Sequence, residues 1–155
     1  MTAGRSARAL MSAVILAGLG GWVGGEAAEH PAGLIKYRQF VMQQTEASMG
    51  AMTQFMEGKI DFRPAFAEQA AAVAATAKEL GSLFPPGSDT GAKTNAKPDV
   101  WAQNMRFRGA GMRFAQEAQK LADAAKAGDA DGFKAQFQNV VDRCNACHEN
   151  FRFPL

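Results

Sequence analysis

Three side chains near the carboxyl end of the chain have the types and spacing of a covalent cofactor site. Cys144 and Cys147 are three residues apart and His148 follows directly, which gives the pattern C-x-x-C-H. On a helix, residues three apart lie on one face, so both thiols can reach the vinyl groups along one haem edge. The imidazole of His148 can then turn under the ring and bind the iron. The pattern predicts a c-type haem attached through Cys144 and Cys147.

Two other uses of paired thiols fit this chain less well. A dithiol redox site opens a helix after a strand in a βαβ unit, and no strand pattern precedes Cys144. A structural zinc site needs four ligands, and His30 is the one further Cys or His in the sequence. A short motif can also arise by chance. A signal for export, to a compartment where haem is attached, would support the haem interpretation independently of the motif.

Residues 1–27 have the composition of a secretory signal peptide. Arg5 and Arg8 give a positive start, and the apolar run that follows at residues 10–19 is too short for a permanent membrane anchor. Gly25 and Ala27 place small residues where signal peptidase inspects the chain, which predicts cleavage after Ala27. We therefore expect a signal peptide over residues 1–27, a domain over 28–155, a periplasmic location and no stable membrane insertion.

The charge of the expected mature chain is close to neutral. Removing residues 1–27 leaves 128 residues, the length of a single domain, and lowers the formal charge from +2 to +1. Both cysteines belong to the motif, so none is left for a disulfide framework. Two ionised haem propionates would bring the charge to about −1. Nothing in this balance indicates binding to nucleic acid.

Apolar residues recur at helical spacing over four long segments. The first helix is expected over residues 31–58, and its apolar positions are Leu34, Tyr37, Val41, Met49, Met52, Phe55 and Met56. The second is expected to start after an Asp61 cap, to run through the alanine-rich stretch 65–80 and to stop at Gly81. Residues 82–98 carry three prolines and two glycines without periodicity, which predicts one long loop.

The third helix is expected to run without a break from Asp99 to Gly128, and the fourth to follow a cap at Asp129 or Asp131. Gly109 and Gly111 inside the third predict close backbone contact or a kink. Four long helices joined by two short turns and one loop predict an all-α fold, an up-down-up-down antiparallel four-helix bundle with covalently bound haem c. The haem site then lies at one end of the bundle.

Several motifs together resemble one known family, the cytochromes c′ or class II c-type cytochromes. Its members carry C-x-x-C-H near the carboxyl end, as this chain does. The sequence Lys-Tyr-Arg-Gln at residues 36–39 and the segments Phe-Pro-Pro-Gly-Ser at 84–88 and Lys-Pro-Asp-Val-Trp at 97–101 complete the resemblance. The family implies a four-helix bundle, commonly a homodimer through its first two helices, and a role outside enzymatic catalysis.

The resemblance also implies haem contacts for individual residues. His148 corresponds to the proximal iron ligand, while Arg38 and Gln39 lie against the haem in such proteins. Arg38 suits a propionate because its forked donors match a carboxylate, although a lone arginine on an amphipathic helix more often faces solvent. Asn95 in the long loop and Arg152, one turn beyond His148, are further expected contacts.

Met42 corresponds to the side chain that covers the distal haem face, and two arrangements stay open. An apolar cover leaves the iron five-coordinate, so that small neutral diatomics such as NO and CO can enter while O₂ lacks a stabilising donor. A related low-spin subgroup instead uses a methionine there as sixth ligand. Met42 as ordinary core filling coincides with the first arrangement.

Two functional classes follow from these arrangements. The chain is either a periplasmic gas-binding haem protein or a one-electron carrier that exchanges electrons with a redox partner protein. A peroxidase-like activity is not expected, because the distal face offers no evident acid–base group and Glu46 has the pattern of a solvated residue.

Overall fold

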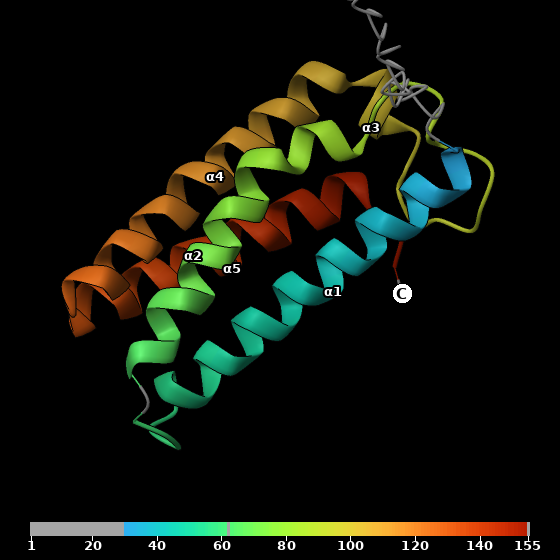
Figure 1. The fold of residues 1–155 in the computed structure, drawn as a ribbon. Coiled ribbons are helices and arrows are strands. Elements are labelled where there is room, and N and C mark those ends of the chain that lie inside the picture. The colour runs from blue at the N-terminus through green and yellow to red at the C-terminus, as the bar shows by residue number, and fades with distance from the viewer. Residues whose placement is uncertain (1–29, 62, 155) are drawn as a thin grey trace, which may run out of the picture.

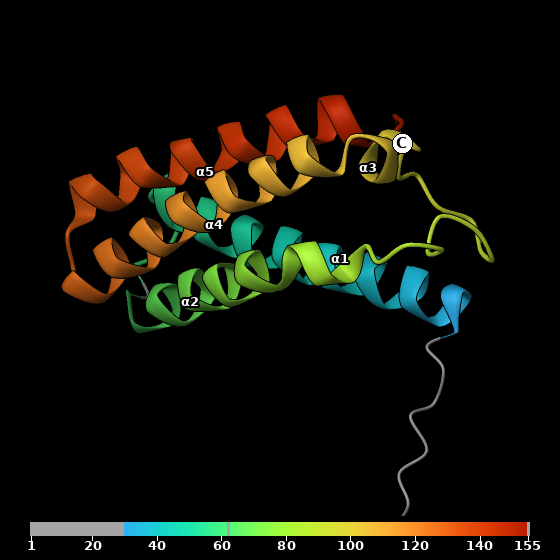
Figure 2. The ribbon, with the colours of Figure 1, turned by 90° about the horizontal axis from the view of Figure 1, so that it is seen from above.

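The computed structural model describes residues 30–61 and 63–154. Four long helices form a bundle: α1 (Pro31–Met56), α2 (Arg63–Glu79), α4 (Asn104–Ala127) and α5 (Ala130–Phe151) (Figure 1). Helices α1 and α2 form one layer, and α4 and α5 form the other (Figure 2). The predicted all-α four-helix bundle is thereby confirmed. The signal peptide expected over residues 1–27 lies outside the described residues.

The end of the bundle that carries the α1–α2 and α4–α5 turns, the turn end, is held by packed aromatic rings. The rings of Phe55 and Phe66 lie 4.2 Å apart between centroids, and Phe133 contacts both from α5. The α4–α5 turn follows the predicted signals: Gly128 has a left-handed φ of 69°, and Asp129 accepts a hydrogen bond from the Gly132 amide at 2.9 Å. Asp129 is therefore the cap of α5.

Gly81 does not stop the helical chain, although the sequence predicted that it would. The α-helix ends at Glu79 and tightens into the 3₁₀ helix η1 (Leu80–Leu83). Gly81 is absent from the described glycines with positive φ, so it does not act as a left-handed cap. Leu80 and Leu83 are both buried, and burial of these two side chains explains why the chain keeps turning past the glycine.

The third predicted helix is interrupted. A single turn, α3 (Asp99–Ala102), is separated from α4 by Gln103, whose φ of −113° and ψ of 42° leave the helical region. The Gln103 side chain donates to the Asp99 carboxylate at 2.6 Å, and the Trp101 indole donates to the Pro85 carbonyl at 3.0 Å. The Gln103 bond closes the single turn of α3 on itself, and the Trp101 bond holds that turn against the loop, so the helix is broken even though the apolar spacing continues across the break.

Two further sequence expectations on side-chain environment are also corrected. Tyr37 is 54% exposed on the outside of α1. A Cβ atom at Gly109 would meet the Arg113 side chain at 3.5 Å, and one at Gly111 would meet Leu80 at 3.8 Å, which are ordinary contact distances. Neither glycine is therefore required by a close backbone approach.

The opposite end of the bundle, the loop end, is closed by the chain that links η1 to α3. An isolated antiparallel bridge pairs Ala96 with Arg152, and the Lys97 amide donates to the Phe151 carbonyl at 2.9 Å. The loop therefore lies against the end of α5, where the C-x-x-C-H motif is found. None of the helices in residues 30–61 and 63–154 is long and apolar enough to cross a membrane.

Candidate haem attachment site

The two thiols of the motif lie half-buried in the last turns of α5. They are not bonded to each other. Burial, together with the nearby Cys147 thiol, raises the pKa of the Cys144 thiol to about 11. Burial also raises the pKa of the Cys147 thiol, although the positive charge of Arg113 opposes this shift. A reactive dithiol needs a lowered pKa, so these surroundings disfavour the redox alternative and suit thiols that end as thioethers.

His148 lies on the side of α5 that is within electrostatic reach of α1. Burial lowers its pKa, the positive Arg152 lowers it further, and Glu46 on α1 opposes the shift. A lowered pKa keeps the imidazole neutral, and neutral imidazole is the form that binds a metal. The environment of His148 therefore suits an iron ligand.

Arg38 is a buried cation held by neutral partners. Its side chain is only 3% exposed, and it donates to the Ser88 hydroxyl at 3.0 Å and the Thr94 hydroxyl at 3.1 Å. Its guanidinium also lies over the rings of Phe84 and Trp101, 4.8 and 5.5 Å from their centroids. Among the described residues it has no ion-pair partner, and its burial is partly offset only by the more distant charge of Asp89.

Gln39, Asn95 and Arg152 lie around the same loop. The side-chain amide of Gln39 donates to the backbone carbonyl of Lys93 at 2.9 Å. The backbone carbonyl of Asn95 accepts from the backbone amide of Phe153 at 2.8 Å. The Arg152 amide donates to the His148 carbonyl at 3.0 Å. The loop thus connects the start of α1 with the end of α5 and brings these predicted residues to one end of the bundle.

Met42 lies one turn after Arg38 on α1. It is half-buried and packs against the main hydrophobic cluster, against which Cys144 also packs from α5. Its surroundings are thus apolar.

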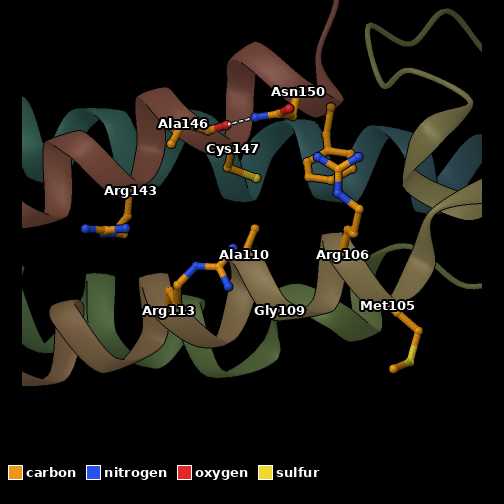
Figure 3. A pocket seen from close by; sticks show the side chains of 10 residues that line it. Met105, Arg106, Gly109, Ala110, Arg113, Arg143, Ala146, Cys147 and Asn150 are labelled. Atoms are coloured by element: carbon orange, nitrogen blue, oxygen red, sulfur yellow. Dashed lines mark hydrogen bonds between the residues drawn. The ribbon is translucent and has the colours of Figure 1, made fainter.

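A cavity of about 240 Å³ opens between α4 and α5 beside Cys147. Figure 3 shows the Cys147 sulfur directed into the space between the two helices, with Arg113 and Arg143 nearby. Ala110 and Phe151 contribute apolar lining. This cavity gives the Cys147 sulfur room for a covalent substituent.

These features fit a covalently held haem. Two thiols on one helix face can form the two thioethers, and His148 can bind the iron. The buried Arg38 has no carboxylate partner in the described part of the chain. A buried cation is stabilised by a paired anion, which a propionate would supply. The donor set present therefore suits haem c better than a bare metal ion. No group of three or more His, Cys, Asp or Glu in residues 30–61 and 63–154 could hold such an ion.

Sequence reasoning missed the residues that hold Arg38. The guanidinium is contacted from the loop and α3 by four residues: Phe84, Ser88, Thr94 and Trp101. Three of the four lie in the segments that carried the family resemblance, so the resemblance could have identified those three as contacts of Arg38. Periodicity could not, because these contacts join residues 46 to 63 positions apart.

Comparison with known proteins agrees with this site. The family model described as Cytochrome C' matches residues 33–152. Cytochrome c' from Pararhodospirillum photometricum is 31% identical over 122 residues, 79% of this chain and 98% of that protein. The crystal structure of cytochrome c' from Rubrivivax gelatinosus matches with a TM-score of 0.76 and 32% identity, covering 81% of this chain and 98% of the other.

A third match is the nitric oxide complex of a leucine-to-alanine mutant of cytochrome c prime from Alcaligenes xylosoxidans. It has a TM-score of 0.75 and 26% identity, and covers 82% of this chain and 98% of that one. The chain thus belongs to the cytochrome c′ family of non-enzymatic haem proteins, with haem c attached through Cys144 and Cys147.

Proposed function

We propose that the protein is a periplasmic haem protein that binds NO and CO at a hindered position, with His148 as the proximal ligand of a five-coordinate iron. The haem supplies the iron position at which a diatomic binds. The observation that carries the proposal is the environment of Met42, which packs half-buried on the same apolar cluster as Cys144 and one turn from Arg38. The NO complex of the A. xylosoxidans relative supports it.

The polar groups near Met42 favour neutral diatomics over O₂. Bound O₂ is polar and is stabilised by a hydrogen-bond donor on the distal side. Arg38 is already engaged with Ser88 and Thr94, and the Thr45 hydroxyl donates to the Val41 carbonyl of its own helix at 2.9 Å. The Thr45 hydroxyl is thus committed, and the remaining Arg38 donors are those proposed above to pair with a propionate. An apolar Met42 cover therefore gives O₂ little help, while NO and CO need none.

The test is the optical spectrum of the ferrous holoprotein with and without CO, in the native chain and in Met42→Ala. We expect a high-spin ferrous spectrum that changes on adding CO. We expect CO association in Met42→Ala to be faster on the order of tenfold, equivalent to about 1.4 kcal/mol of barrier, because the cover is removed. NO is then added under the same conditions.

Met49→Ala is the matched control for this substitution. Met49 is also half-buried on α1 and packs on the same cluster, but it lies two turns beyond Met42. Equal acceleration in both variants would indicate general loosening of the core and contradict a specific cover. A low-spin ferrous spectrum that resists CO, and becomes high-spin only in Met42→Ala, would make Met42 the sixth ligand and the chain an electron carrier.

Export is part of the same proposal, with residues 1–27 as signal peptide and residues 28–155 as the mature protein. The charged and apolar pattern of residues 1–27 supports it, and the family match begins only at residue 33. Amino-terminal sequencing of protein purified from the periplasm is expected to begin at Ala28. An intact amino terminus in a membrane fraction would contradict it.

A homodimer through α1 and α2 completes the proposed function. Tyr37 and Phe40 are 54% and 65% exposed, and their spacing of three residues places them on one outward face of α1. Large exposed aromatic side chains on one face are typical of an interface. We expect sedimentation of a dimer for the native chain and of a monomer for Phe40→Glu. An unchanged sedimentation coefficient in Phe40→Glu would place the interface elsewhere.

A further inference from the structure

His30 is an exposed histidine that the haem site does not use. The chain has two histidines, and the other, His148, is the proposed iron ligand. His30 comes directly before Pro31, the first residue of α1, and Pro31 lies against Gly91 of the loop (Figure 1). The His30 side chain makes no capping hydrogen bond to the helix, although it occupies the cap position. The holoprotein therefore presents one imaging-independent imidazole, that of His30, to ligands from solution.

The backbone of His30 is outside the helical hydrogen-bond pattern. Its φ of −74° and ψ of 118° are extended, and its carbonyl accepts the first helical bond, from the Leu34 amide at 3.1 Å. The amide nitrogens at the start of a helix have no partner within that helix. Among the described residues, none accepts a hydrogen bond from the His30 amide. This amide can therefore give up its proton to a metal ion without breaking a bond of α1.

The proposed cleavage after Ala27 would make His30 the third residue of the mature chain, after Ala28 and Glu29. Ala28 and Glu29 lie outside the described residues, and only their covalent order is used here. A free α-amine, the two amide nitrogens of Glu29 and His30, and the imidazole then follow one another along the chain. Neither Glu29 nor His30 is proline, so both amides carry a proton that a metal can displace. Four nitrogens in this order can close three small fused chelate rings around one metal ion.

This spacing is strict. A histidine in second place would leave only one amide nitrogen between the amine and the imidazole, and one in fourth place would make the last ring too large. Four nitrogens held in one plane are typical ligands of Cu(II) and Ni(II), and Cu(II) binds such sites more tightly. The site needs a single side chain, so it does not require the cluster of His, Cys, Asp and Glu that residues 30–61 and 63–154 lack.

We propose that the mature amino terminus binds one Cu(II) ion in a square-planar site. Its four ligands are the Ala28 amine, the Glu29 and His30 amide nitrogens, and Nδ1 of His30. Binding releases the ammonium proton and two amide protons to solvent, and the two anionic nitrogens balance the charge of the ion. No electron is transferred. The inference rests on the proposed cleavage after Ala27 and does not depend on whether the haem binds NO or CO.

The probe is one equivalent of Cu(II), added to ferric holoprotein purified from the periplasm and followed by electron paramagnetic resonance. Ferric haem and Cu(II) give signals at different fields, so both can be observed in one sample. We expect the Cu(II) spectrum of four equatorial nitrogens, and we expect the copper to stay bound through a desalting column. An excess of Zn(II) is not expected to displace it, because Zn(II) prefers tetrahedral coordination.

Three variants separate the chelate from simple binding to an exposed histidine. His30→Gln and Glu29→Pro are both expected to lose the four-nitrogen spectrum. Glu29→Pro keeps the imidazole and the terminal amine, but it has no amide proton to displace. Glu29→Gln is the matched control, since it removes only the carboxylate at the same position, and it is expected to keep the spectrum. The optical spectrum of the haem is expected to be unchanged in all three, which shows that each variant has folded.

Mass spectrometry of the intact protein establishes the first residue before copper is added. A chain that starts at Ala28 but gives a Cu(II) spectrum of mixed nitrogen and oxygen ligands would overturn the copper site alone. A chain that starts at any other residue would overturn both the copper site and the proposed cleavage. A four-nitrogen spectrum in Glu29→Pro would also overturn the site, because it would require ligands other than those named. The CO spectrum tests the gas-binding function separately.

Discussion

The two ends of the bundle are stabilised in different ways. At the turn end, aromatic rings pack on one another, and short turns at Gly58 and Gly128 join neighbouring helices. At the loop end, a buried cation is surrounded by hydroxyls and rings that the loop and α3 supply. The turn end is held by apolar burial, whereas the loop end depends on polar contacts between residues 50 and 56 positions apart.

This difference suits the separate roles of the two ends. Apolar packing tolerates no charge, so a buried guanidinium at the turn end would lack partners. The loop end accepts Arg38 because Ser88 and Thr94 satisfy its donors, with the Ser88 hydroxyl engaged in turn with the Pro85 carbonyl at 2.8 Å. We infer that the turn end supplies most of the stability and the loop end positions polar groups for the haem.

Phe66→Ala at the turn end is expected to give the largest loss of stability. Phe66 is 6% exposed and contacts both Phe55 and Phe133, so its removal leaves a cavity worth about 3–5 kcal/mol of unfolding free energy. Guanidinium unfolding of the holoprotein, followed by far-ultraviolet circular dichroism, measures this. Met112→Ala, at an exposed residue of α4, is the control and is expected to change stability by less than about 0.5 kcal/mol. A haem spectrum altered by Phe66→Ala would contradict the independence of the two ends.

Arg38→Met tests the loop end. It removes two hydrogen bonds and the stacking on Phe84 and Trp101, and we expect a loss of about 1–3 kcal/mol. Arg38→Lys is expected to recover less than half, because an ammonium lacks the planar fork of donors. Limited proteolysis is the second measurement, and cleavage within residues 84–98 is expected to accelerate in Arg38→Met and to a smaller extent in Arg38→Lys. An unchanged cleavage rate would mean that Arg38 does not hold the loop.

The same contrast explains how much the sequence predicted. The turn end follows local signals: Gly128 and Asp129 are adjacent to the helices they end and begin. The motif of Cys144, Cys147 and His148 is equally local, since one helix carries all three residues. Such features need only the geometry of a helix, and the turn at Gly128 and Asp129 is as predicted. At Gly81 the same kind of local signal failed, because burial of Leu80 and Leu83 keeps the chain turning.

The loop end could not be predicted from periodicity. A helical pattern places Tyr37 inside and Arg38 outside, because tyrosine is the more apolar, but the structure has the opposite. Arg38 is buried because loop residues 50 and 56 positions away satisfy it. The break at Gln103 likewise depends on the Trp101 contact with Pro85, which no local signal encodes.

Glycine substitutions compare the backbone at the two ends. Gly128 has a φ of 69° with open space around it, so Gly128→Ala is expected to cost about 1–2 kcal/mol from conformation alone. Gly91 has a φ of 103°, and a Cβ there would also lie 3.3 Å from the Pro31 side chain, so Gly91→Ala is expected to cost more. Gly50→Ala inside α1 is the control and is expected to stabilise by about 0.5–1 kcal/mol. Equal losses at Gly91 and Gly128, measured by thermal unfolding, would mean that the Pro31 contact relaxes freely.

Two lysines give the smallest and sharpest comparison. Lys126 lies at the turn end, in the last turn of α4. Lys97 lies at the loop end, where its ammonium donates to the backbone carbonyl of Glu149, near the end of α5, at 2.8 Å. Both cations interact favourably with a helix carboxyl terminus, which is worth about 0.3–1 kcal/mol. Lys97→Met is expected to lose more than Lys126→Met, because it also breaks a bond between the loop and the helix of His148. Urea unfolding at low salt measures both losses. If the two are equal, the Lys97 bond adds nothing to the charge effect, and the loop is held to α5 by its backbone pairing alone.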